Sequence, residues 1–145
     1  METLVRRLGR IFSLKDQDKE QPTSPPQRFL RRMDRLEQTL SVWMEEKGWR
    51  VPVRTVSEAA QRLGTDTGTL YAYFQERVGM DFRTWRTRLR LEDAKQMLAE
   101  NPLLAPADAA RLCGFSNRSN FSRQFLAYTG QTPAQWQRDS RSSVE

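Results

Sequence analysis

Residues 118 to 123 carry a group of hydrogen-bonding side chains whose types and spacing suit the recognition of nucleic-acid bases. Phe121 and Phe125 lie four residues apart, so on a helix they share one apolar face. The polar residues then lie on or beside the opposite face: Arg118, Ser119, Asn120, Ser122 and Arg123. Arginine can hold guanine through two hydrogen bonds, and asparagine or serine can add smaller contacts. This surface therefore has the chemistry to read base edges in DNA.

A matching surface about fifty residues earlier is poorer in such chemistry. Its residues are Thr67, Gly68, Tyr71 and Ala72, with Thr69 alongside, and they include no Arg, Lys, Gln or Asn. Tyrosine and threonine can hydrogen-bond, and alanine can meet a thymine methyl group. Gly68 weakens a helix by up to about 1 kcal/mol relative to alanine. We therefore expect the later surface to supply most of the base readout. The earlier surface is expected to position the protein through phosphate contacts or to contribute little.

Other residues are candidates for phosphate contact. The amide groups at a helix start favour an anion, and Thr132 begins a predicted helix without the negative charge that Asp66 places at another. Four arginines crowd the start of a long predicted helix: Arg83, Arg86, Arg88 and Arg90. They fit phosphate contact and, equally, a solvated face that Glu92 and Asp93 partly neutralise. Both interpretations stay open for these four residues.

A duplicated unit positions the two base-facing surfaces. Residues 105–136 align with residues 55–85, and the shared landmarks are small residues, glycines and aromatic residues. In the first copy these landmarks are Glu58, Ala59, Ala60, Gly64, Leu70, Phe74, Gly79 and Trp85. In the second copy they are Asp108, Ala109, Ala110, Gly114, Phe121, Phe125, Gly130 and Trp136. Each copy predicts a helix-turn-helix with a glycine in its turn and an exposed outer side on its second helix.

Local signals mark where these helices begin and end. Thr55 and Glu58 form a predicted capping box, in which the Thr55 hydroxyl accepts from the Glu58 amide and the Glu58 carboxylate accepts from the Thr55 amide. Pro106 suits a first helical position, and Gly64 and Gly114 suit helix ends. Asp66 caps the second helix of the first copy, and either Ser116 or Asn117 caps that of the second copy.

Two longer helices complete the predicted fold. One opens the domain from Phe29 to Lys47, with Gly48 as its stop. The other runs from Arg83 to Glu100 between the two copies, and Asn101 and Pro102 end it. A helix of this length is about 25 Å long. Successive major grooves on one face of a DNA duplex lie about 34 Å apart. Modules at the two ends of the helix are therefore expected to enter neighbouring grooves.

The segment GFSNRSNFSRQF, with TGQTPAQW after it and RLRLEDAKQML before it, resembles the DNA-binding domain of the AraC/XylS family of bacterial transcription regulators. The resemblance spans about Leu36 to Arg138. It implies an all-α fold, a bihelical arrangement of two helix-turn-helix subdomains joined by a linker helix. It also implies sequence-specific binding of double-stranded DNA in the bacterial cytoplasm and contact with RNA polymerase. In the family, the positions that match Ser119, Ser122 and Arg123 face the groove, and we expect Arg123 to be the principal reader.

Composition limits the alternatives. The chain has 145 residues, no histidine and one cysteine, Cys113. This excludes histidine-based catalysis and the usual zinc sites, so we expect no enzyme activity, no cofactor and no metal. Cys113 is expected to be a small buried apolar residue. The predicted domain covers residues 28–139, after a basic amphipathic segment and proline-rich linker at residues 1–27 and before a short tail at residues 140–145.

The net charge of +6 is unevenly distributed. Residues 1–33 hold eight basic and four acidic residues, whereas residues 34–139 hold fifteen and thirteen. Residues 1–15 fit a helix on a membrane surface, a helix that packs on the domain or on a protein partner, or an unfolded end. The weak charge of residues 34–139 leaves a second interpretation of the whole chain. In that interpretation it is an interaction or membrane-tethered module that keeps the fold but binds specific DNA weakly or not at all.

Overall fold

The computed structural model describes residues 26–142, so the amphipathic segment predicted at the amino-terminal end lies outside it. The described residues form helices and no strand, as the sequence predicts. They divide into two compact units. Within the described range, the first unit holds residues 26–48 and 53–85, and the second holds residues 49–52 and 86–142. None of the helices between residues 26 and 142 has the length and apolar character needed to cross a bilayer.

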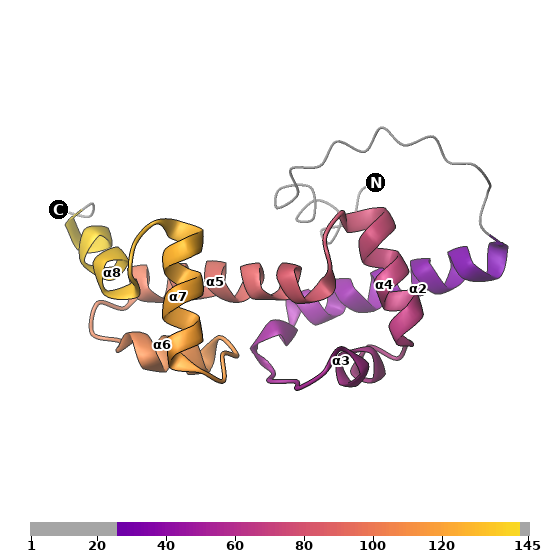
Figure 1. The fold of residues 1–145 in the computed structure, drawn as a ribbon, viewed down its shortest axis with the longest axis horizontal. Coiled ribbons are helices and arrows are strands. Elements are labelled where there is room, and N and C mark those ends of the chain that lie inside the picture. Colours follow the sequence, from indigo (N-terminus) through magenta and orange to yellow (C-terminus); the bar gives the residue numbers. More distant parts are fainter. Residues whose placement is uncertain (1–25, 143–145) are drawn as a thin grey trace. The chain divides into compact units, whose positions relative to one another are not determined.

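The first unit is built on a long helix that packs on the first helix-turn-helix (Figure 1). Its elements are α2 (Gln27–Glu45), α3 (Val56–Arg62), α4 (Thr67–Tyr73), the π-helical turn η2 (Phe74–Val78) and the start of α5 (Phe82–Glu100). One stripe of α2 is buried at helical spacing: Met33, Leu36, Leu40 and Met44. The core beside it is aromatic, with Phe74 and Trp85 fully buried and 5.1 Å between their ring centroids.

The end of α2 differs from the prediction. The helix ends at Glu45, and Lys47, not Gly48, adopts the left-handed backbone, with a φ of 55°. Gly48 has a different role, because a Cβ atom there would lie 2.2 Å from the indole ring of Trp43. The glycine therefore serves the close approach of a side chain, which a local stop signal does not reveal.

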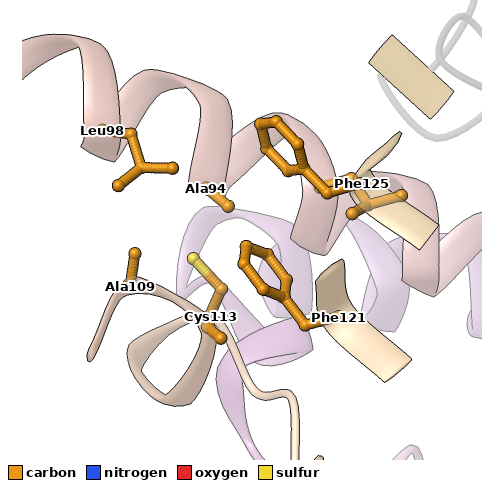
Figure 2. Close-up of a cluster of buried hydrophobic side chains, with 8 residues drawn as sticks. Ala94, Leu98, Ala109, Cys113, Phe121 and Phe125 are labelled. Atoms are coloured by element: carbon orange, nitrogen blue, oxygen red, sulfur yellow. The ribbon is translucent and has the colours of Figure 1, made fainter. Parts of the chain in front are cut away.

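The second unit repeats the helix-turn-helix on the remainder of α5. Its other helices are α6 (Pro106–Leu112), α7 (Arg118–Thr129) and α8 (Pro133–Ser142). Figure 2 shows Phe121 and Phe125 of α7 pointing toward Ala94 and Leu98 of α5. Cys113 is fully buried in the same cluster, which confirms the apolar role predicted for it. Burial raises the pKa of its thiol to about 12, so the sulfur stays protonated.

Residues 49–52 belong to the second unit and are held there by a polar cluster. The carboxylate of Asp93 accepts two hydrogen bonds from Arg50, at 2.7 and 2.8 Å, and one from the Trp49 indole at 2.8 Å. Arg90 donates to the carbonyl oxygens of Trp49 at 2.6 Å and of Val51 at 3.2 Å. This corrects the expectation for two residues, because the side chains of Arg90 and Asp93 are largely buried, hold residues 49–52 and do not form a solvated or phosphate-binding face.

The structure also locates the helix ends nearest to the predicted domain limits. Helix α2 begins at Gln27, which the sequence placed in the linker. Helix α8 extends to Ser142, so residues 140–142 of the predicted tail are helical. Pro106 occupies the first turn of α6, and Gly64 and Gly114 adopt positive φ angles of 69° and 101°, as expected for these helix ends.

Candidate nucleic-acid interface

Helix α7 presents the richer of the two predicted surfaces. Phe121 and Phe125 are 1% and 0% exposed, so they fix which side of the helix faces the core. The structure brings the five predicted side chains together on the exposed side: Arg118, Ser119, Asn120, Ser122 and Arg123. Their exposure agrees with the sequence pattern, and their role in base recognition stays a prediction.

Sequence reasoning missed the contribution of Gln124 to this surface. Its side-chain amide donates to the side-chain oxygen of Asn120 at 2.9 Å, so it orients the amide of a candidate base-reading residue. The two residues are four positions apart on α7, and this spacing is the signal that could have identified the pair. Asn120 therefore keeps its amide hydrogens for a ligand while its oxygen is engaged.

Helix α4 presents fewer exposed hydrogen-bonding side chains than its counterpart. Thr67 and Gly68 are exposed, Tyr71 is 65% exposed, and Ala72 is half-buried. Thr69 is buried and donates its hydroxyl to Asp66 at 2.9 Å, so it is not available to a ligand as the sequence had suggested. Tyr71 is thus the largest exposed group that α4 offers.

The two candidate recognition helices begin with different charges. Asp66 caps α4 by accepting from the Thr69 amide at 2.8 Å. The hydrogen bonds from the Thr69 amide and hydroxyl lower the pKa of Asp66, and the nearby positive charge of Arg32 adds to this effect. Asn117 caps α7 by accepting from the Asn120 amide at 2.9 Å, which settles the choice between Ser116 and Asn117. The cap of α4 is therefore a negatively charged aspartate, whereas the cap of α7 is a neutral asparagine followed by Arg118.

The cap of α3 follows the prediction in one bond and departs from it in the other. The Thr55 hydroxyl accepts from the Glu58 amide at 3.0 Å, as expected. The Glu58 carboxylate accepts from the amide of Arg54 at 3.0 Å, not from that of Thr55. Thr55 has an extended backbone, with φ −134° and ψ 157°, which brings the preceding amide within reach of the carboxylate.

Thr132, the predicted phosphate contact at the start of α8, is exposed but closely engaged. Its amide donates to the side-chain oxygen of Gln135 at 2.9 Å, and the Gln135 amide donates to the Thr132 hydroxyl at 3.2 Å. This reciprocal pair is a capping box that occupies the Thr132 amide. A phosphate at Thr132 would therefore be met by the hydroxyl hydrogen.

The arginines at the start of α5 lie in different surroundings. Arg83 is exposed, whereas Arg86 and Arg88 are half-buried and already engaged in interactions. Arg90 is only 8% exposed, and burial followed by the charge of Arg86 lowers the pKa of its guanidinium to about 10. Of the three other arginines, Arg83 is the most accessible. Within residues 26–142, no group of three or more Cys, Asp or Glu residues could hold a metal ion.

Comparison with known proteins relates this arrangement to regulators of transcription. A family model described as a helix-turn-helix domain matches residues 59–139. Over 69 residues, or 46% of the chain, the sequence is 39% identical to a protein of Photobacterium leiognathi named "Probable transcriptional regulator LumQ", of which this stretch covers 27%. The chain spans about a quarter to a third of the length of the curated relatives it matches.

Two solved structures resemble the chain in fold. The C-terminal domain of the two-component response regulator yesN from Fusobacterium nucleatum is 25% identical, with a TM-score of 0.61 over 70% of this chain and 95% of that one. A DNA-binding transcriptional dual regulator from Escherichia coli K-12 is 19% identical, with a TM-score of 0.61 over 85% of this chain and 99% of that one. The second likeness concerns the fold alone.

Proposed function

The chain belongs to the family of AraC-type helix-turn-helix domains, and on this basis we propose that it is a sequence-specific transcription regulator that binds double-stranded DNA in the bacterial cytoplasm. The family consists of DNA-binding regulators and not of enzymes, in line with the expectation from composition. The observation that carries the proposal is the outer face of α7, where exposed hydrogen-bonding side chains stand opposite two buried phenylalanines.

Helix α7 is proposed to lie in the major groove and to supply most of the base readout. Arg123 is the principal reader, since its guanidinium is exposed and can bind guanine through two hydrogen bonds. Ser119 and Ser122 add smaller contacts, and Asn120 contributes the amide hydrogens that Gln124 leaves free. Arg118, in the first turn of α7, is placed to meet a base or the adjoining phosphate.

Helix α4 is proposed to enter the neighbouring major groove with a smaller share of the readout. Thr67, Gly68, Tyr71 and Ala72 form its base-facing surface, and Tyr71 is the main hydrogen-bonding group among them. Phosphate contacts from Thr132, Arg83, Arg86 and Arg88 would fix the register of the protein on the duplex. Activation through contact with RNA polymerase is the mode of action that the family resemblance implies.

Selection of preferred sites from random duplexes tests this function. The full chain should enrich a motif with two half-sites about one helical turn apart. A chain that lacks residues 1–25 should enrich the same motif, because the proposed readers lie on α4 and α7. Binding that depends on residues 1–25 and shows no sequence preference would contradict the proposal. That outcome would support the interaction or membrane-tethered module instead.

A further inference from the structure

Four arginines form a regular stripe along the amino-terminal half of α2, and three of them belong to the basic residues 1–33. Their spacings of three and four residues place them on one face of the helix: Arg28, Arg31, Arg32 and Arg35. At about 100° per residue they fall within an arc of about 100°, largely opposite the buried stripe of α2. All four are exposed, so this positive charge belongs to the surface of the folded first unit.

No acidic group within residues 26–142 forms an ion pair with this arginine stripe. Asp34 lies within the run, but its carboxylate pairs with Arg77 at 3.0 Å. Glu37 is buried, accepts from the Tyr73 hydroxyl at 2.9 Å, and lies 3.7 Å from the same Arg77 guanidinium. Among the ion pairs of the described residues, none involves an arginine of the stripe. The four guanidinium groups can therefore bind an external partner.

The stripe lies beside the first recognition helix. Helix α2 packs on α4 and extends past it within the first unit (Figure 1). Arg32 is close enough to Asp66, the cap of α4, for its charge to act on the carboxylate. The stripe thus adjoins the amino-terminal end of the helix that is proposed to enter a major groove. A duplex that receives α4 brings its backbone phosphates to this part of the protein.

We infer that the arginine stripe of α2 is a phosphate-binding surface, which holds the first module on the DNA backbone beside its half-site. The inference rests on the proposed function. It explains how the first module can bind DNA although the base-facing residues of α4 include no cation. Phosphate contacts can supply affinity, while α7 supplies the choice of sequence. Residues 28 to 35 span about 10 Å of helix, so the charges form a row that can follow successive phosphates of one strand.

The chemistry of the stripe favours a duplex over an acidic protein partner. Leu30, at 36% exposure, is the large apolar residue exposed next to the stripe, whereas stable protein interfaces are centred on several buried apolar or aromatic anchors. Arginine matches phosphate by donating two hydrogen bonds in parallel, and a regular row of charges needs no particular base sequence. The stripe should therefore contribute equally on preferred and random DNA.

Two fourfold variants of the full chain test the inference. In the first, Arg28, Arg31, Arg32 and Arg35 are all changed to Gln, which removes the charge and keeps a helix-forming residue. In the second, the same residues are changed to Lys, which keeps the charge. Affinity for a duplex that carries the selected site is measured between about 0.05 and 0.3 M salt. Urea unfolding of both variants shows whether the fold is intact.

In the glutamine variant, the slope of log K against the logarithm of the salt concentration should become less steep by at least two units. The expected change is about one unit for each phosphate contact that is removed. Its affinity at about 0.15 M salt should fall at least tenfold, with an unchanged base preference. The lysine variant should stay close to the unaltered chain. An unchanged slope in the glutamine variant, or a loss of binding to anionic vesicles with DNA binding intact, overturns the inference. If the unaltered chain itself prefers no duplex sequence, the proposed function fails instead.

Discussion

The two helix-turn-helix modules have the same interior and different outer surfaces. Leu70 and Phe74 of the first module match Phe121 and Phe125 of the second, and each is at most 1% exposed. Outside, α7 has a neutral cap and two exposed arginines, whereas α4 has an aspartate cap and no cation. The repeated pattern in the sequence therefore reports the packing that both modules need. It does not report an equal share in binding.

The modules also differ in how their turns are supported. Gly114 of the second module lies against the segment 49–52, because a Cβ atom there would be 2.5 Å from the Trp49 carbonyl oxygen and 2.8 Å from Arg90 Nε. At the matching Gly64 of the first module, a Cβ atom would have no neighbour within 4 Å apart from the adjoining residues of the chain. Two glycines at equivalent positions are thus required for different reasons. Gly64 is required by its backbone conformation alone, and Gly114 by both its conformation and the lack of space for a side chain.

Replacement of each glycine by alanine should distinguish these two reasons, and it should cause the largest loss of stability among the changes considered. Gly64→Ala should cost about 1–2 kcal/mol of the free energy of unfolding, because φ is 69° and only the left-handed backbone is penalised. Gly114→Ala should cost about 3 kcal/mol or more, because the new methyl group also displaces the Trp49 backbone. Urea unfolding of the two variants measures both values. Equal costs would show that the contact with residues 49–52 contributes nothing to stability.

The carboxylate of Asp93 should make the stability of the second module depend on pH in the acidic range. Burial alone would raise the pKa of Asp93, but hydrogen bonds from Arg50 and Trp49 outweigh it and leave the pKa below the ordinary value of 3.8. A carboxyl group with a lowered pKa stabilises the fold above its ordinary pKa and loses this contribution as the pH falls through the lowered value. The stability of the chain should therefore fall as the pH drops below about 4.

The substitution Asp93→Asn tests this expectation. It should cost about 2 kcal/mol near neutral pH, since it removes the charged partner of Arg50, whose side chain is 35% exposed. The variant should also show a shallower loss of stability below about pH 4 than the unaltered chain. Unfolding midpoints between about pH 2 and 7 provide the measurement. Parallel curves for the two proteins would mean that other carboxyl groups cause the acid sensitivity.

The sequence predicted those parts of the fold that depend on local patterns. Helix starts at Asp66 and Pro106, left-handed ends at Gly64 and Gly114, and burial of Cys113 follow from residue type and helical spacing. The exposed face of α7 was equally predictable, because two phenylalanines four residues apart determine which side is buried. Signals within one helix turn were sufficient for each of these features.

Features that depend on distant residues were not predictable in the same way. The burial of Arg90 requires carbonyl groups about forty residues earlier, and Gly48 is needed because a tryptophan ring lies against it. The α2 stripe was not predicted, because net charge was counted along the chain and not by helical face. A helical arrangement of residues 28–35 would have revealed the stripe.

Truncation of one exposed side chain on each recognition helix should sharpen the functional contrast between the modules. Arg123→Ala should cost about 1–3 kcal/mol at the preferred site and relax the choice of base there. Tyr71→Ala should cost less than about 1 kcal/mol, because α4 is expected to add little readout. Competition binding with the selected site and random duplexes measures both. Equal losses for Arg123→Ala on both duplexes would make that residue a phosphate contact.

The smallest expected difference lies in the caps of the two leading helices, α3 and α6. Thr55 caps α3 through its side chain, whereas Ala105 precedes α6 without a side-chain cap. Thr55→Ala should therefore lower the free energy of unfolding by about 1 kcal/mol, and Ala105→Ser should raise it by about 0.5 kcal/mol. The gain is small because the Asp108 amide already donates to the Ala105 carbonyl at 2.9 Å. Urea unfolding that showed no gain from Ala105→Ser would mean that this backbone bond already satisfies the start of α6.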